Sequence, residues 1–361
     1  MTPQKFNKIL LIAGLAILAL IVVFGSFYVC WDSAPAEKTC ASCHEIRCEV
    51  HELENSSHRD LECKECHGTA LSSGLRSMKE KSMMIVEHMR HVNPEDVRMS
   101  EAQIIEVMDN CRRCHTYEYA KWEAGEHSST YADIFLDSLQ NSAEQLNYDC
   151  LRCHGMFYEG TIADLVEPIS TTGPWNLKDA SRGNLPTIPC LACHQVHTDG
   201  YPLGSVPENI SDSLGREYNA ARSGLGFYDR AEKTHFNVES LPQLKLYQDG
   251  GLLPVSEDSA MRNCVQCHAP NSRHEAGTSS DKTPRGVHAG LSCVACHDPH
   301  GNDARNSCVN CHPAVSNCKM DVTKMNTTYL DPDSPNDIHT VSCTDCHEEK
   351  KVIVRIIEKK D

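Results

Sequence analysis

Cys40-Ala41-Ser42-Cys43-His44 is the first of nine copies of the pattern Cys-x-x-Cys-His in this 361-residue chain. The other copies begin at Cys63, Cys111, Cys150, Cys190, Cys264, Cys293, Cys308 and Cys343. Together the copies use 18 of the 21 cysteines, and a histidine directly follows the second cysteine every time. Zinc sites, disulfide scaffolds and thioredoxin-like sites also use Cys-x-x-Cys, but they do not explain the repeated histidine.

The complete pattern is the attachment motif of c-type haem. Its two thiols can add across the haem vinyl groups, and the adjacent imidazole can bind the iron as the proximal ligand. We therefore expect nine covalently bound haem groups. The expected thioether cysteines are Cys40, Cys43, Cys63, Cys66, Cys111, Cys114, Cys150, Cys153, Cys190, Cys193, Cys264, Cys267, Cys293, Cys296, Cys308, Cys311, Cys343 and Cys346. The expected proximal ligands are His44, His67, His115, His154, His194, His268, His297, His312 and His347.

Eleven further histidines remain as candidates for the distal ligand on the opposite face of each iron. They are His51, His58, His88, His91, His127, His197, His235, His274, His288, His300 and His339. This number allows every iron to be six-coordinate, a state that suits electron transfer and leaves no vacancy for a substrate. The count therefore favours an electron-carrying chain of haems. The alternatives are an oxidoreductase acting on a small nitrogen or sulfur compound at one five-coordinate haem, and a filament-forming structural cytochrome.

The polypeptide between the motifs has few of the side chains that build an ordinary core. Aromatic residues make up only 6% of the chain, and residues 32–361 supply about 37 residues per motif. We expect haem faces to form the apolar interior of a mostly α-helical protein with extensive loops and little sheet. Sequence patterns predict helices over residues 75–92 and 131–146, and loops over 168–189 and 197–226.

The chain is acidic, with a formal net charge of −16, and haem propionates would add further carboxylates. Nucleic acid and anionic membrane surfaces are therefore poor partners. A redox protein with a basic patch fits the charge, and so does plain solubility. The sequence leaves the oligomeric state, the electron acceptor and the direction of electron flow open.

An uncharged apolar run lies at the N-terminus, from Ile9 to Val29, after Lys5 and Lys8. Its 21 residues are long enough to cross a bilayer as a helix, and Trp31 stands where an interfacial aromatic residue would. The alternative is a cleaved signal peptide, whose apolar part is usually shorter. We expect a retained anchor in the cytoplasmic membrane, with the haem-bearing part on the extracytoplasmic side, as the positive-inside rule and haem attachment both require.

Three cysteines lie outside the motifs. Cys30 suggests a lipoprotein site, but the preceding Tyr28-Val29 lacks the small residues that such a site wants, so we interpret Cys30 as an ordinary residue at the membrane boundary. Cys48 and Cys318 could pair in an exported chain, and the sequence does not decide whether they do.

A family resemblance covers roughly the first third of the chain. Cys40-Ala-Ser-Cys43-His44-Glu45-Ile46, then Ser56-Ser57-His58, then Cys63-Lys-Glu-Cys66-His67 resembles the opening of the membrane-anchored quinol dehydrogenases of the NapC/NrfH family. The resemblance implies that this region takes electrons from membrane quinol at the first haem. Many relatives place a methionine ligand where this chain has Ile46. The first haem must then use another ligand or remain five-coordinate.

A second resemblance begins after the third motif. The element Trp122-Glu-Ala-Gly125-Glu-His127 resembles one in larger multihaem cytochromes, including the octahaem hydroxylamine-oxidoreductase-like group. There the histidine reaches a neighbouring haem, which implies a distal role for His127. We expect three regions: a transmembrane anchor at 1–31, a NapC/NrfH-like region with motifs one to three at 32–125, and a multihaem cytochrome region with motifs four to nine at 126–361.

Overall fold

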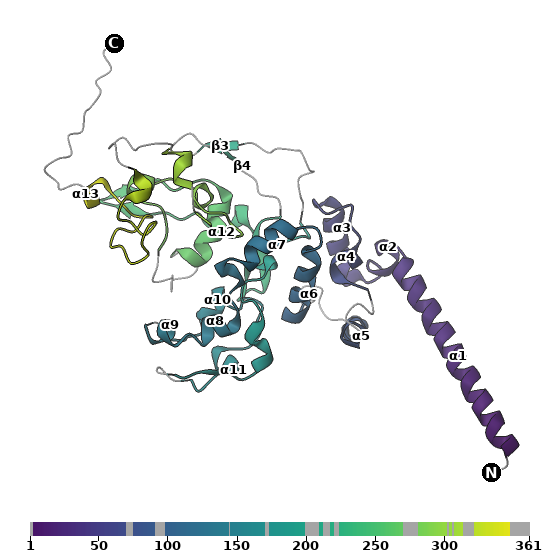
Figure 1. The fold of residues 1–361 in the computed structure, drawn as a ribbon. Coiled ribbons are helices and arrows are strands. Elements are labelled where there is room, and N and C mark those ends of the chain that lie inside the picture. The colour runs from purple at the N-terminus through teal and green to yellow at the C-terminus, as the bar shows by residue number, and fades with distance from the viewer. Residues whose placement is uncertain are drawn as a thin grey trace. The chain divides into compact units, whose positions relative to one another are not determined.

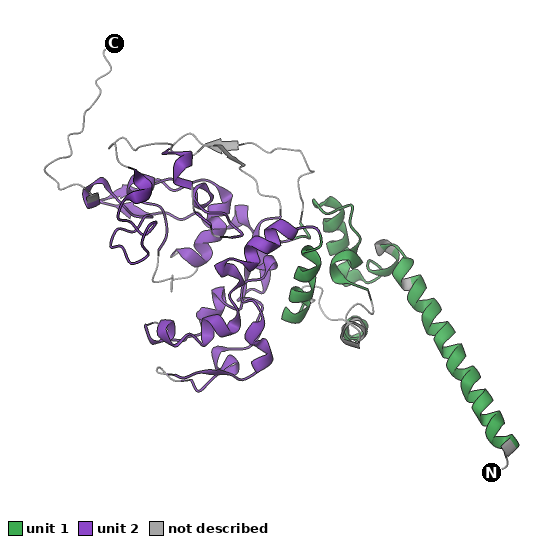
Figure 2. Ribbon diagram, in the orientation of Figure 1, with its two compact units in different colours: residues 1–113, 196–200 green, residues 114–195, 201–361 purple. Residues whose placement is uncertain are grey.

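The structure is a computed structural model. It describes residues 3–69, 75–90, 98–143, 145–169, 173–198, 209–211, 217–219, 224–269, 281–301, 303–304, 307–312 and 321–346. The chain divides into two compact units (Figure 2). Unit 1 comprises Met1–Arg113 with Val196–Gly200, and unit 2 comprises Cys114–Gln195 with Tyr201–Asp361.

Unit 1 is helical throughout its described elements (Figure 1). These elements are α1 (Pro3–Ser33), α2 (Ala36–Thr39), η1 (His44–Ile46), α3 (Arg47–Asn55), α4 (Cys63–His67), α5 (Leu75–Met89) and α6 (Glu101–Cys111). Helix α5 confirms the helix predicted from residue 75, although it ends at Met89. Residues 91–97, which include His91 and the predicted end of that helix, lie outside the described residues.

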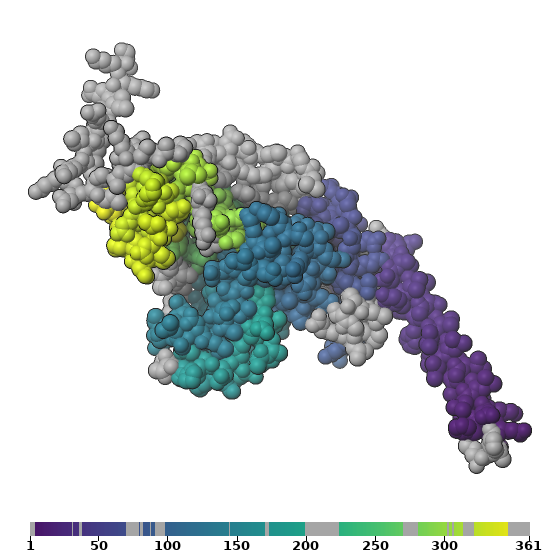
Figure 3. All heavy atoms as spheres, viewed as in Figure 1, coloured from purple at the N-terminus to yellow at the C-terminus, as the bar shows by residue number. Residues whose placement is uncertain are grey.

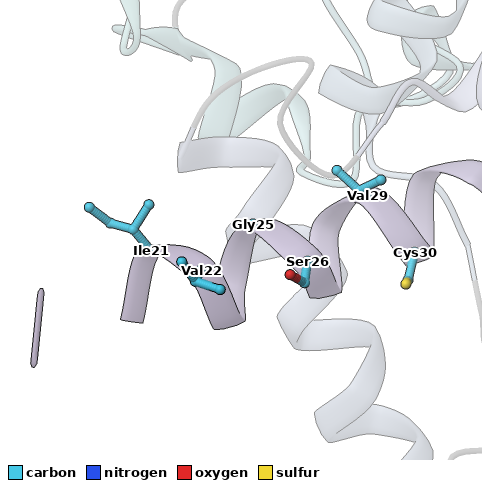
Figure 4. A pocket seen from close by; sticks show the side chains of 6 residues that line it. All are labelled: Ile21, Val22, Gly25, Ser26, Val29 and Cys30. Carbon is cyan, nitrogen blue, oxygen red and sulfur yellow. The ribbon is translucent and has the colours of Figure 1, made fainter. Parts of the chain in front are cut away.

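Helix α1 contains the predicted apolar segment. Within it, Gln4–Cys30 is long and apolar enough to cross a membrane, has a mean hydropathy of 2.9 and is not buried against the rest of the described chain (Figure 3). A signal sequence has the same properties, so the choice between anchor and signal stays a prediction. Figure 4 shows a hollow on this helix, lined by Ile21, Val22, Gly25, Ser26, Val29 and Cys30. Within the described residues, a single helix forms this hollow.

Helix α6 holds the second motif in place within unit 1. It begins with a reciprocal capping box, in which Ser100 accepts from the Gln103 amide and Gln103 accepts from the Ser100 amide. At its other end, the Asn110 side chain donates to the Cys66 carbonyl over 2.7 Å, and Arg113 donates to the Glu65 carbonyl. These bonds fix the turn that carries Cys66 directly against α6.

Unit 2 carries helices that are mostly one to two turns long. They are α7 (Thr116–Glu123), η3 (Glu126–Ser128), α8 (Tyr131–Phe135), α9 (Ser138–Ala143), α10 (Cys150–Cys153), α11 (Ile162–Leu165), η4 (Ala180–Asn184), η5 (Cys190–Ala192), η6 (Val238–Ser240), α12 (Ser259–His268), η7 (Gly286–His288), η8 (Cys293–Ala295), η9 (Ser307–Asn310), η10 (Val322–Lys324) and α13 (Cys343–Cys346).

The single helix predicted over 131–146 is wrong, because two helices, α8 and α9, occupy this stretch. Asp137 lies between them, and its carboxylate accepts hydrogen bonds from the amides of Leu139 and Gln140 at 2.9 and 3.2 Å. Aspartate in this position caps the first turn of a new helix and so favours a break over a continuation.

A small apolar core lies in unit 2. It consists of the buried side chains of Tyr131, Phe135, Leu151, Ile162, Leu165, Val166 and Trp175. A second, smaller cluster contains Met261, Val265 and Ala269. Both clusters include residues inside or next to attachment motifs, so the apolar contacts are gathered where the motifs are.

Sheet is limited, in the part of the chain that the structure describes, to four antiparallel two-stranded ribbons. The strands pair as β1 (Val166–Glu167) with β2 (Asn176–Leu177), β3 (Asn209–Ser211) with β4 (Glu217–Asn219), β5 (Gly226–Asp229) with β6 (Thr234–Asn237), and β7 (Tyr247–Gln248) with β8 (Gly251–Leu252). This agrees with the predicted helical, loop-rich architecture.

Candidate haem sites

Several attachment motifs form one helical turn, as in α10, η5, η8 and η9, and the sixth motif forms the end of α12. In four of them the histidine amide donates to the carbonyl of the first cysteine, at 2.9 Å for His154, 3.0 Å for His194, 3.0 Å for His297 and 2.7 Å for His312. Residues three and four positions apart lie on the same face of a helix. The turn therefore presents both thiols and the imidazole of one motif to the same side, as one planar ligand attached by two thioethers requires.

Five motif histidines face a histidine from outside the motifs. In unit 1, the ring centroids of His44 and His88 lie 5.3 Å apart, and those of His67 and His197 lie 5.9 Å apart. The planes of these rings are inclined by 56° and 48°. The structure thus places two predicted distal ligands opposite two predicted proximal ones.

The other three pairs lie in unit 2. Centroid distances are 6.2 Å for His268 with His127, 6.1 Å for His194 with His300, and 5.9 Å for His297 with His339. The last two pairs are nearly parallel, with interplanar angles of 7° and 1°, whereas His127 is inclined by 46° to His268.

These separations fit a metal held between two imidazoles. A metal–nitrogen bond of about 2 Å on each side, with each ring centre about 1 Å beyond its nitrogen, puts two ring centres about 6 Å apart. Four pairs lie within a few tenths of an ångström of that spacing, and His44 with His88 is the closest pair at 5.3 Å. The donor set and the adjacent thiol pairs fit haem c at these places.

Carboxylates lie within hydrogen-bond distance of Nδ1 in three of the five non-motif histidines. Nδ1 of His88 lies 2.7 and 2.9 Å from the two Glu45 oxygens, Nδ1 of His339 lies 2.8 Å from Asp337, and Nδ1 of His197 bonds Glu49. An ionised carboxylate only accepts, so Nδ1 must carry the proton. In His197 and His339, Nε2 then keeps its lone pair for a metal, which is the usual arrangement behind a metal-bound histidine. At His88 the arrangement differs, because the same Glu45 oxygen also lies 3.3 Å from Nε2 of His44, so the carboxylate stands between the two rings.

The two better buried carboxylates have lowered pKa values. Burial alone raises the pKa of Glu45, but hydrogen bonds with its own backbone and with His88, and the nearby His44 and His88 imidazoles, lower it overall. Burial likewise opposes ionisation of Asp337, yet hydrogen bonds with His339 and Lys282 bring its pKa down to about 2. Both groups are therefore charged at neutral pH.

Ligand atoms of Cys43, Glu45 and His88 lie within 4.8 Å of one another. Among the described residues, this is the one group of its kind spaced to hold a metal ion directly. Cys43 is also the second thiol of an attachment motif, and thioether formation would remove it as a thiolate. The cluster then reduces to the carboxylate–imidazole pair of Glu45 and His88.

The remaining distal candidates have other surroundings. His235 donates from Nε2 to the Leu191 carbonyl over 2.6 Å and packs against Tyr228. His288 bonds the Ile338 carbonyl, and burial lowers its pKa, with smaller effects from His312 and His339. His51 is exposed, and His58 lies beside Ser57. His91 and His274 lie outside the described residues.

Four motif histidines are outside the five pairs. His115 is exposed beside Glu118, and His312 lies close enough to His288 to influence its pKa. Burial lowers the pKa of His154 to about 4, with contributions from His268 and His127. His347 lies outside the described residues, as do Cys318 and the side chain of Cys346. The pairing of Cys48 with Cys318 therefore stays a prediction, and Cys48 itself is exposed.

Thiols of different motifs are in contact. Hydrogen bonds join Cys40 with Cys63, Cys153 with Cys267, and Cys264 with Cys293. These hydrogen bonds and burial raise the pKa values of Cys63, Cys267 and Cys293. Burial raises the pKa of Cys193 to about 12, and the nearby Cys264 adds to this shift. The sixth motif, Cys264–His268, therefore contacts the fourth and seventh motifs and lies close to the fifth.

Several contacts support two of the histidine pairs in unit 2. Gly125 packs so closely that a Cβ there would lie 3.2 Å from the His300 carbonyl oxygen. Lys121 forms an ion pair with Asp298, and the indole of Trp122 donates to the Ile188 carbonyl over 3.1 Å. The helix that precedes His127 is thereby fixed against the loop that carries His300.

The three carboxylates that bind distal candidates, Glu45, Glu49 and Asp337, were not predicted from the sequence. Asp337 lies two residues before His339, and Glu45 directly follows a motif histidine. Proximity in sequence was an available signal for Asp337 alone, because the contact of Glu45 with His88 joins residues that are 43 positions apart. No local signal links Glu49 to His197, because their contact depends on the fold.

Two family profiles match parts of the chain. Residues 35–201 match outer membrane cytochrome MtrC/MtrF-like, domains II/IV, and residues 230–298 match cytochrome c554 and c-prime. No curated protein and no solved structure matches the chain. The two matches, together with the repeated motif, identify the chain as a multihaem c-type cytochrome that binds haem c covalently and takes part in electron transfer.

Proposed function

We propose that this chain is a membrane-anchored nine-haem cytochrome that carries electrons from the quinol pool to periplasmic or extracellular redox proteins. Haem supplies one-electron oxidation and reduction when it is bound. The polypeptide supplies the thiols that attach it, the imidazoles that close both faces of the iron, and the surface that partners meet. The proposed regions are those predicted from the sequence, at 1–31, 32–125 and 126–361.

The observation that carries the proposal is the pairing of motif with non-motif histidines. Each of the five pairs joins one of each kind, at centroid distances from 5.3 to 6.2 Å. Two imidazole ligands leave no open position on the iron and change little between its two oxidation states. This ligation favours electron transfer over substrate chemistry.

Contacts between motifs support electron transfer between the first and second motifs and among the fourth to seventh. Cys40 contacts Cys63, which brings the first and second motifs of unit 1 together. In unit 2, Cys264 and Cys267 bring the sixth motif into contact with the fourth and seventh and close to the fifth. Neighbouring attachment sites shorten the distance that an electron must cross, and the sixth motif would be a branch point.

The proposed transfer of electrons from quinol involves the N-terminal third of the chain. An exposed apolar helix precedes the first motif, and the first two motifs resemble those of NapC/NrfH-family quinol dehydrogenases. His88 and Glu45 both lie beside His44, so either can take the place of the methionine ligand that Ile46 cannot supply. The match to an outer membrane cytochrome profile supports an extracytoplasmic, membrane-associated location, and the proposal assigns the anchor to the cytoplasmic membrane.

An oxidoreductase with one five-coordinate iron is the second candidate, and His154 is the residue that favours it. This motif histidine is half-buried, and the nearby His127 and His268 already face each other. Nδ1 of His154 is buried without a hydrogen-bond partner. A small nitrogen or sulfur compound could then bind at the open face of that site.

Two measurements on the full-length protein in detergent test the proposal. Intact mass should exceed the polypeptide mass by nine haems, and electron paramagnetic resonance of the oxidised protein should show low-spin iron alone. A high-spin signal that changes on adding nitrite or hydroxylamine would favour the oxidoreductase. In membranes, a reduced menaquinol analogue should reduce the haems, and failure to do so would remove the quinol step.

A further inference from the structure

We propose that Asp337 and Lys282 form a charge pair that sets the reduction potential of the iron held between His297 and His339. Asp337 is a positioning residue, which orients His339 and holds the potential down, and Lys282 opposes its charge. Both act through His339 and not as ligands themselves. This inference rests on the proposed function and goes further, because it assigns two charged residues to the tuning of one haem site.

The Asp337 carboxylate is bonded through both of its oxygens. One oxygen lies 2.8 Å from Nδ1 of His339 and accepts from the His339 amide over 3.0 Å. The Thr328 hydroxyl lies 3.5 Å from the same oxygen. The other oxygen accepts from the Lys282 ammonium over 3.1 Å. Bonds on both oxygens fix the carboxylate, and a fixed carboxylate fixes the ring that donates to it.

This carboxylate lies outside the space between the paired rings. Within the described residues, its ion pairs are with His339 and Lys282 and not with His297. Glu45 differs, since one of its oxygens also lies 3.3 Å from Nε2 of a motif histidine. Because Asp337 holds the proton on Nδ1 of His339, Nε2 of that ring keeps its lone pair for the iron. The parallel rings, 5.9 Å apart, match the spacing of two imidazoles on one metal.

Lys282 is joined by its backbone to a second haem site. Its amide donates over 3.1 Å to the carbonyl of His268, the histidine of the sixth motif. Three residues further on, the Arg285 amide donates to the His339 carbonyl over 2.7 Å. These backbone bonds place Lys282 beside Asp337, so the charge pair is a fixed part of the fold.

The two charges act on the iron in opposite directions. A carboxylate that accepts from Nδ1 makes the imidazole a stronger electron donor. Its negative charge also stabilises the oxidised iron, which carries one more positive charge than the reduced iron. Both effects lower the reduction potential. The Lys282 ammonium cancels part of that negative charge, and because its side chain is 42% exposed, water reduces the effect.

The test is a potentiometric titration of full-length holoprotein in detergent, followed by electron paramagnetic resonance. The low-spin signal that is lost in H339A identifies the component to follow. In D337N a neutral amide oxygen can still accept from Nδ1. We expect the component to move upward in this variant, with about a tenfold rise in its ratio of reduced to oxidised iron, which is about 59 mV for a one-electron couple.

Two variants of Lys282 test the opposite sign. In K282M the same component should move downward, with about a threefold fall in the ratio, as expected for a partly exposed ion pair. K282R keeps the positive charge, so its potential should stay close to wild type.

Asp321 provides the matched control. It also pairs with a lysine, since Lys324 lies 3.0 Å away, and it accepts from the Thr323 amide and hydroxyl at 3.1 and 2.7 Å. Its partners in the described part of the chain include no histidine. D321N should therefore leave every potential unchanged. A shift of the same component as large as that in D337N would overturn the inference, because any lost surface charge would then have the same effect.

Opposite shifts in D337N and K282M distinguish tuning by charge from a structural disturbance. Shifts in the same direction, or unchanged potentials at full haem content, overturn the inference and leave the proposed function intact. If D337N fails to accumulate with its full haem content, K282M and K282R decide the question, and equal potentials in these two overturn the inference. A wild-type protein without covalent haem would contradict the proposed function itself, so the two failures are distinguishable.

Discussion

The imidazole of His297 lies parallel to that of His339, with an interplanar angle of 1° and a centroid distance of 5.9 Å. One ring belongs to an attachment motif, and the other is held from behind by Asp337 at 2.8 Å. Asp337 is held in turn by Lys282 at 3.1 Å. The orientation of the distal ring is thus set by a chain of charged contacts.

Ring orientation predicts two classes of low-spin signal. Two parallel imidazoles interact with the same one of a pair of iron d orbitals, so the two orbitals differ in energy. Two steeply inclined imidazoles leave the energies of the two orbitals similar. We expect rhombic spectra from the pairs inclined by 1° and 7°, and more anisotropic spectra from those inclined by 46° to 56°. Electron paramagnetic resonance of the oxidised protein measures both classes, and spectra of a single class would contradict the ring geometry.

Replacing a distal candidate should open one iron. In H339A we expect one rhombic low-spin signal to disappear and one high-spin signal to appear, because His297 loses its opposite ring. H235A is the matched control, since His235 bonds the Leu191 carbonyl and packs against Tyr228. It should leave all spin states unchanged and lower stability by about 1 kcal/mol. A high-spin signal in H235A would make that histidine a ligand.

Most of the correct predictions of structure came from local sequence patterns. The helix over 3–33 contains the uncharged apolar run that was predicted to be helical, and the helix over 75–89 lies within the predicted stretch 75–92. The pairing of rings did not follow, because His127 and His268, or His67 and His197, are brought together by the fold and not by neighbouring sequence.

The break between α8 and α9 was also not predicted from the sequence. The apolar residues of 131–146 fit one helix, but Asp137 competes for the amides of Leu139 and Gln140 and starts a second one. The contacts between carboxylates and the distal histidines could not be predicted from the sequence either. Acidic residues are common in this chain, and the sequence does not show which of its 50 acidic side chains meets a histidine.

The cap of α8 predicts a pH-dependent contribution to stability. Hydrogen bonds from the Thr130 amide at 2.9 Å and the Thr130 hydroxyl at 2.8 Å lower the pKa of Asp133. A carboxyl whose pKa is lowered in the folded state stabilises that state above its unfolded value of about 4, and the effect is lost as pH falls below it.

In T130A we expect a loss of about 1 kcal/mol at neutral pH. In D133N the contribution that depends on pH should vanish. Denaturant unfolding between pH 3 and pH 7 measures both effects, with pH values chosen to bracket an ordinary carboxyl pKa of about 4. An unchanged pH dependence in D133N would show that the cap charge adds nothing.

Gly125 predicts a steric coupling between two histidine pairs. A Cβ at this position would meet the backbone of His300 at 3.2 Å and of Gly301 at 3.3 Å, and neither can turn away as a side chain would. We therefore expect G125A to cost about 1–3 kcal/mol, as overpacking usually does. G301A is the matched control, because its nearest neighbour, Lys121, would be at 3.5 Å, an ordinary contact.

The position of Gly125 gives this variant a second, spectroscopic readout. Gly125 lies two residues before His127, and the loop that it touches carries His300. G125A should therefore shift the low-spin signals of the pairs His127 with His268 and His194 with His300, and leave the pair His297 with His339 unchanged. Denaturant unfolding and electron paramagnetic resonance on G125A and G301A provide the comparison. Equal stabilities and identical spectra for the two variants would show that the contact at Gly125 does not position the rings.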